Sequence, residues 1–147
     1  MTEKRSVTSL IEQMEQQPGI LQLDEYRQHG RHSVLDHSKN VARFSCVLNR
    51  KLHLKADEPC MVRVAMLHDY FLYDWHDGKP ERRIHGFTHA EEARRNAVRE
   101  FDINQHEQEM IRSHMWPLNI TKIPRSREAW LICMADKAAA LYEVFSK

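Results

Sequence analysis

The sequence predicts an all-α fold, a compact single-domain helical bundle of about six to seven helices, and three observations carry this prediction. Helix breakers are few, because only four glycines and five prolines occur in 147 residues, and they fall between periodic segments or at the start of one. Between the breakers, apolar residues recur at helical spacing. The length suits one hydrophobic core, so residues 1–147 are expected to form a single domain.

The expected helices follow this punctuation in chain order. Capping-box patterns, Thr88 with Glu91 and Asn104 with Glu107, mark the starts of the fifth and sixth helices, and Pro117 should end the sixth. The first helix is expected to pack on the core formed by the others. The helices are expected at about residues 6–17, 21–28, 33–52, 58–72, 88–101, 105–115 and 126–145.

Composition leaves several classes of protein without support. The formal net charge is +1, from 22 basic and 21 acidic residues, which gives no strong sign of a nucleic-acid partner or a membrane surface. No apolar run approaches the roughly 20 residues that span a bilayer. The three cysteines are odd in number and widely spaced, which is typical of core residues in a reducing compartment. We therefore expect a cytoplasmic protein.

Polar residues interrupt the apolar faces of the expected helices. A histidine takes an inward position in the third and fourth helices, and Asp136 does so in the last. Asp69 lies about 100° further round than His68 and still reaches the same side. The stripes are Val34, His37, Val41, Phe44 and Leu48; Met61, Val64, Ala65, His68 and Leu72; and Ala129, Ile132, Cys133, Asp136, Ala140 and Val144; His89 is in line with Ala93 and Ala97, and His114 with Met110 and Ile111.

Taken singly, each of these residues has a structural explanation. A buried histidine is commonly bonded to a backbone carbonyl, and Asp136 could pair with Arg43 or Lys137. The whole set of four histidines and two carboxylates is satisfied together if a cation lies between them. Nitrogen and oxygen ligands without thiolate suit one or two divalent ions of iron, manganese, zinc, nickel or cobalt, and two ions could share a bridging carboxylate.

The order of these residues resembles the HD-domain superfamily of metal-dependent phosphohydrolases, which is all-helical. The resemblance extends from about Leu35 to Phe145 and includes "DHSKNVARFS", "HAEEARRNA", "IRSHMWPL" and "WLICMADKAAALYEVF". It implies that one metal is held by His37, His68, Asp69 and Asp136. It also implies that Asp69 bridges to a second metal, held by His89 and His114.

Two further histidines compete for places in this set. His85 is the main rival of His89, and His32 is a lesser rival of His37. We prefer His89 because "HAEEA" opens a capped helix, whereas "RIHGF" resembles a loop. That loop belongs to residues 73–87, the longest irregular segment, which is expected to border the site.

The resemblance implies hydrolysis of a small phosphorylated metabolite, nucleotides first, by a water activated between two metals. Asp69 would serve as the catalytic bridging ligand. Lys137 would contact the substrate phosphate, or else form a surface salt bridge. Two arginines, Arg82 and Arg83, could contact an anionic substrate, or could simply be solvated. Four aromatic residues could stack on a base, or could pack between helices: Tyr70, Phe71, Tyr73 and Trp75.

Two other functions stay open from the sequence. One branch of the same superfamily uses a diiron form of the six-ligand site to activate dioxygen. The protein could also be a non-catalytic module that binds a metal or a ligand. The sequence contains no Gly-x-Ser-x-Gly motif, Walker loop or dinucleotide fingerprint, which leaves covalent hydrolases and nucleotide-cradle enzymes without support.

Overall fold

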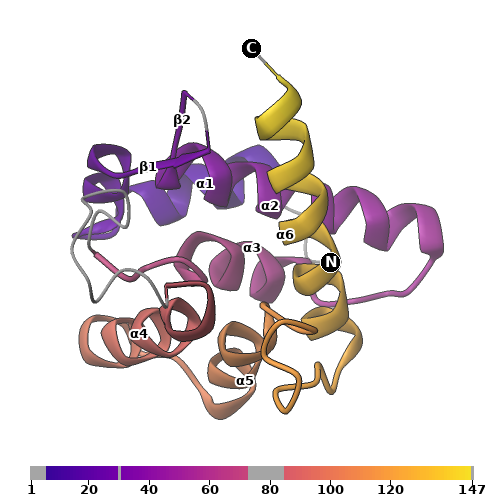
Figure 1. Ribbon diagram of the computed structural model, residues 1–147. Coiled ribbons are helices and arrows are strands. Elements are labelled where there is room, and N and C mark those ends of the chain that lie inside the picture. Colours follow the sequence, from indigo (N-terminus) through magenta and orange to yellow (C-terminus); the bar gives the residue numbers. More distant parts are fainter. Residues whose placement is uncertain (1–5, 30, 73–84, 147) are drawn as a thin grey trace.

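The computed structural model describes residues 6–29, 31–72 and 85–146, which fold as a helical bundle with one short hairpin (Figure 1). The all-α prediction is confirmed. In the described residues the elements are α1 (Val7–Glu15), the 3-10 helix η1 (Ile20–Glu25), β1 (Arg27–His29), β2 (His32–Ser33), α2 (Val34–Leu52), α3 (Glu58–Leu67), α4 (His85–Glu100), α5 (Gln105–Ser113) and α6 (Arg127–Phe145).

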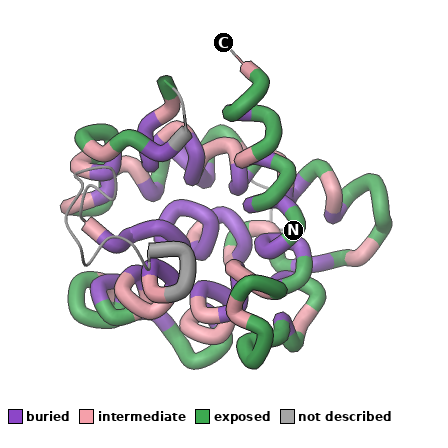
Figure 2. The backbone as a smooth tube through the Cα atoms, in the orientation of Figure 1, coloured by how far each residue is buried: buried purple, intermediate pink, exposed green. Residues whose placement is uncertain are grey.

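The core is built around α3. Every residue from Met61 to Phe71 is buried except Arg63, and α1, α2, α5 and α6 all pack against this helix. Figure 2 shows the buried stretches on the inner sides of the surrounding helices and the exposed stretches on their outer sides. Residues that directly follow α3 are therefore delivered to the middle of the bundle. None of the described helices is long and apolar enough to cross a membrane.

Helix starts carry the side-chain caps that isolated backbone N–H groups require. The Asn104–Glu107 capping box is confirmed at α5, and a second box, Ser33 with Asp36, opens α2. The Thr88–Glu91 prediction is wrong, because α4 begins at His85 and contains both residues. Gly86 is the second residue of α4, so a glycine at this position does not prevent the helix from starting before Thr88.

Two other boundaries differ from the sequence predictions. In place of a helix over 21–28, η1 ends at Glu25 and an antiparallel hairpin follows, with Arg27 opposite Ser33. Ile20 and Leu23, three residues apart, are the buried residues of η1, a spacing that suits the three residues per turn of a 3-10 helix. The predicted α3 over 58–72 is also too long, because this helix ends at Leu67.

A hydrogen-bonded anchor explains why the chain leaves α3 early. The Asn96 side chain on α4 donates to the carbonyl oxygens of Tyr70 and Phe71, at 2.9 and 3.1 Å. The Tyr70 hydroxyl donates to Glu100 at 2.7 Å and accepts from Gln22 at 2.9 Å. These contacts bind the turn after α3 to α4 and η1, and they satisfy carbonyls that a continuing helix would have used.

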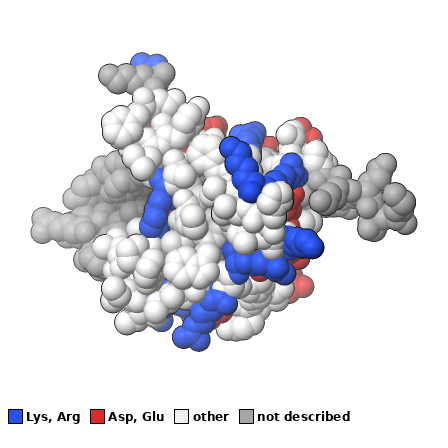
Figure 3. All heavy atoms as spheres, turned by 90° about the vertical axis from the view of Figure 1, so that its right-hand side faces the viewer, with Lys and Arg blue, Asp and Glu red and all other residues white. Residues whose placement is uncertain are grey.

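The exposed side of α6 carries apolar as well as charged residues, among them Lys137. On the side of the molecule that Figure 3 shows, lysine and arginine side chains form separate groups with wide uncharged areas between them. Trp130, Met134 and Leu141 are among the exposed apolar residues of α6. Helix α6 therefore has apolar residues on its exposed side and polar residues on its buried side, which is not the pattern of an ordinary amphipathic helix.

We predict that Asn96→Ala lowers the free energy of unfolding by about 2 kcal/mol, because it leaves two buried carbonyl groups without a partner. Urea denaturation followed by circular dichroism measures the change. The exposed Gln105→Ala on α5 is the control and should stay within about 0.5 kcal/mol of the wild type. Equal urea midpoints for Asn96→Ala and the wild type would show that α4 does not hold the turn.

Candidate metal centre

Five helices bring the six predicted ligands together in the interior. His37 lies in the first turn of α2, and His68 and Asp69 directly follow α3. His89 lies in the first half of α4, His114 is the C-cap of α5, and Asp136 lies in the middle of α6. All six side chains are buried: His37, His68, Asp69, His89, His114 and Asp136.

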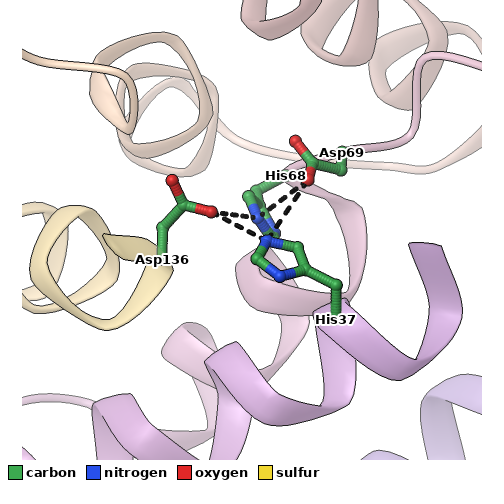
Figure 4. A group of neighbouring side chains, drawn as sticks. All are labelled: His37, His68, Asp69 and Asp136. Carbon is green, nitrogen blue, oxygen red and sulfur yellow. Dashed lines mark hydrogen bonds and ion pairs between the residues drawn. The ribbon is translucent and has the colours of Figure 1, made fainter. Parts of the chain in front are cut away.

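The first group consists of His37, His68, Asp69 and Asp136, which lie together in Figure 4. Nε2 of His37 is 2.8 Å from Asp136 Oδ1 and 3.4 Å from Asp69 Oδ2. Nε2 of His68 is 3.2 Å and 3.4 Å from the same two oxygens. Two imidazole nitrogens and two carboxylate oxygens thus converge on one point.

The second group consists of Asp69, His89 and His114. The Nε2 atoms of the two histidines are 3.0 Å apart. They lie 3.2 and 3.3 Å from Asp69 Oδ1. This group has three ligand atoms where the first has four.

Asp69 belongs to both groups through different oxygens. Its Oδ2 faces the first group and also accepts a hydrogen bond of 2.8 Å from Gln28 on β1. Its Oδ1 faces the second group, is buried, and has no hydrogen-bond partner among the described residues. An unbonded carboxylate oxygen in the interior is costly, and a cation between the three ligand atoms would satisfy it.

The hydrogen bonds of the outer ring nitrogens direct Nε2 inward. Nδ1 of His68 lies 2.6 Å from the Ala65 carbonyl oxygen, and Nδ1 of His114 lies 2.6 Å from that of Ile111. A carbonyl only accepts, so each Nδ1 carries the hydrogen. In the neutral ring Nε2 then presents its lone pair to the group, as a metal ligand must.

The distances fit a metal-ligand shell. Atoms bound at about 2.0–2.2 Å to one ion lie roughly 2.8–3.6 Å from one another, whether the shell is octahedral or tetrahedral. The contacts within the two groups run from 2.8 to 3.4 Å. The buried groups can therefore each hold a metal ion, with nitrogen and oxygen ligands only.

Protonation equilibria reflect the same crowding of charge. Burial lowers the pKa of His37, but hydrogen bonds to Asp136 and Glu143 outweigh it and raise the pKa to about 10. Burial and the neighbouring His68 lower the pKa of His114, although Asp69 opposes the shift. Burial tends to raise the pKa of Asp69, yet the adjacent His68 and the nearby rings of His114 and His89 hold it well below its ordinary value.

Other residues named from the sequence lie elsewhere. His32 is half-buried and 6.4 Å from the Tyr142 ring, and neither ligand group includes it. The exposed Lys137 donates to the carbonyl oxygens of His114 and Cys133, at 3.3 and 3.4 Å, and forms no ion pair with any described residue. Tyr70 packs in the core, and Phe71 contacts the His89 ring edge-on at 5.7 Å. The side chains of five named residues lie outside the described part of the chain: Tyr73, Trp75, Arg82, Arg83 and His85.

Sequence reasoning missed two buried polar residues beside the site, Gln28 and Glu143. The sequence predicts a helix at Gln28, but this residue lies in the hairpin, which directs its amide to Asp69. Glu143 was passed over in favour of its neighbour Val144, which is 59% exposed while Glu143 is 1% exposed. A spacing of seven residues from Asp136, two helical turns, was the available signal for Glu143.

Comparison with known proteins identifies one family. The family described as HD domain matches residues 34–141, which include all six ligand candidates. No curated protein and no solved structure matches the chain.

We predict that His114→Ala removes one equivalent of bound metal and leaves the other, because the first group keeps all four ligands. Elemental analysis after gel filtration gives the stoichiometry. The exposed His106→Ala on α5 is the control and should retain the wild-type stoichiometry. If His114→Ala and the wild type bound equal amounts, the second group would not be a metal site.

Metal affinity should rise with pH. The pKa of His37 is raised from 6.5 to about 10, so the metal-free ring carries a proton at neutral pH that the metal must displace. For one displaced proton the apparent affinity increases by about tenfold per pH unit below that pKa. Calorimetric titration in two buffers of different ionisation enthalpy counts the released protons. A count of zero at pH 7 would contradict the prediction.

Proposed function

Because the chain belongs to the HD domain family, whose members are typically metal-dependent hydrolases, we propose that it is a metal-dependent phosphohydrolase. The proposed substrate is a small phosphorylated metabolite, a nucleotide-like phosphomonoester or phosphodiester. The protein would require one or two divalent metal ions.

One observation supports this proposal above the others. The two oxygens of Asp69 face separate groups of ligands, Oδ2 toward His37 and His68 and Oδ1 toward His89 and His114. Such a shared carboxylate suits a pair of metal ions. When bound, a metal pair activates water as a nucleophile and neutralises charge on a phosphoryl group.

The residues of the chain have defined tasks in this scheme. The ring nitrogens that face the groups would hold the ions, and their rings are fixed by hydrogen bonds on the opposite side. Asp69 would set the distance between the two positions. Lys137, whose amine bonds to the carbonyl oxygen of His114 at 3.3 Å, would hold its positive charge beside the second group for the substrate phosphate.

The second candidate function is oxidative. Four imidazoles and two carboxylates, without a thiolate in either group, also suit iron, which the oxygenase branch of the superfamily uses. A non-catalytic metal module is the third candidate. The second group supports it less, since three ligands leave a position open, whereas structural metal sites are closed.

We predict that the purified protein releases phosphate from a panel of phosphomonoesters, or hydrolyses nitrophenyl phosphate, when divalent metal is present. A chelator should abolish the activity. Asp69→Ala should lower kcat/KM by several orders of magnitude, because it removes a ligand shared by both groups. Asp102→Ala, at an exposed position, is the control and should keep the wild-type rate.

Two outcomes would overturn the assignment. Activity that Asp69→Ala or a chelator leaves unchanged would come from another site or a contaminant. Iron in the purified protein, no hydrolysis across the panel and consumption of dioxygen with a reduced substrate would instead favour the oxidative candidate.

A further inference from the structure

At the end of α6, apolar side chains are exposed and a carboxylate is buried. Leu141, Val144 and Phe145 are 60, 59 and 78% exposed, whereas Glu143 among them is 1% exposed. A carboxylate is among the least favourable groups to bury without partners. Its position in the interior therefore requires specific contacts.

Glu143 contacts His37, a ligand of the first group. The Glu143 carboxylate oxygens lie 2.8 and 3.0 Å from His37 Nδ1. One of them also accepts a hydrogen bond of 3.0 Å from the Asn40 side chain, one turn along α2 from His37. No lysine or arginine among the described residues forms an ion pair with Glu143.

Helix α6 holds the His37 ring from both ends. Asp136 Oδ1 is 2.8 Å from Nε2, and Glu143 is 2.8 Å from Nδ1. The two acidic residues are seven positions apart, which places them on one face and about 10 Å apart along the helix. The imidazole lies between them, so its orientation is set by α6 although the residue belongs to α2.

The other histidines with described Nδ1 contacts are held differently. The Nδ1 atoms of His68 and His114 bond to the backbone carbonyl oxygens of the residues three positions earlier, so the local backbone provides these contacts. Nδ1 of His37 instead contacts the side chain of Glu143, which is 106 residues away in the sequence. Residue 143 also lies beyond the end of the segment that matches the family, residues 34–141.

We propose that Glu143 is a positioning residue, which holds His37 with its Nε2 directed into the first group and thereby strengthens metal binding there. A carboxylate only accepts hydrogen bonds, so Nδ1 carries the hydrogen and the neutral ring offers its Nε2 lone pair to the metal. The inference rests on the metal site of the proposed function, and it does not depend on the reaction catalysed.

The test measures metal affinity and does not use activity. Metal-free protein is titrated with Zn²⁺ against a chromophoric chelator, and Co²⁺ absorption spectra report ligand geometry. Glu143→Ala should weaken binding at the first group by about 10–100-fold, the usual effect of losing such a partner. Glu143→Gln should recover part of this loss, since its amide oxygen can still accept from Nδ1.

Glu128→Ala is the matched control. Glu128 is also a buried carboxylate of α6, but it accepts from the backbone N–H of Asp57 at 3.0 Å and does not contact the site. This variant should lose stability and keep the wild-type affinity and Co²⁺ spectrum. Unchanged affinity in Glu143→Ala, whether or not stability falls, would overturn the inference.

If Glu143→Ala does not fold, Glu143→Asp decides the question. It keeps the charge and withdraws the carboxylate by about 1.5 Å, one carbon–carbon bond, so affinity should still fall. Wild-type affinity in this variant would refute the positioning role. A wild-type protein that binds no metal would refute the metal site itself, so failures of the inference and of the proposed function are distinguishable.

Discussion

The arrangement of this protein depends on one buried carboxylate at which four histidine rings meet. Asp69 is 1% exposed and is approached by Nε2 atoms from four helical segments. Its two oxygens cannot both be satisfied by the described hydrogen-bond donors, since only Oδ2 has one, from Gln28. The four histidines that meet Asp69 come from α2, from the C-caps of α3 and α5, and from α4, so the site lies where these segments converge.

The ends of helices do much of the positioning. His68 is the C-cap of α3 and His114 the C-cap of α5, so each ring can bond back to a carbonyl of its own last turn. After Asp69 the chain turns toward α4, where the Asn96 side chain binds the carbonyl oxygens of Tyr70 and Phe71.

Long periodic segments and the ligand types were predictable from sequence. The inward positions of His37 and Asp136 followed from the faces of α2 and α6, because a polar residue on an apolar stripe is conspicuous. The hairpin of Gln28 was not predictable, since its strands have three and two residues and form only against the rest of the fold. Glu143 was missed because α6 is apolar on several sides, so periodicity alone did not identify which side faces inward.

The long separation of the ligands along the chain has a consequence for how the protein matures. His37 and Asp136 are 99 residues apart in sequence and come within 2.8 Å. Closing so large a loop has an entropic cost that must be met before the contact forms. During synthesis, the first group can be completed only after α6 has left the ribosome. Metal would then be acquired only by a chain in which α2 and α6 have already come together.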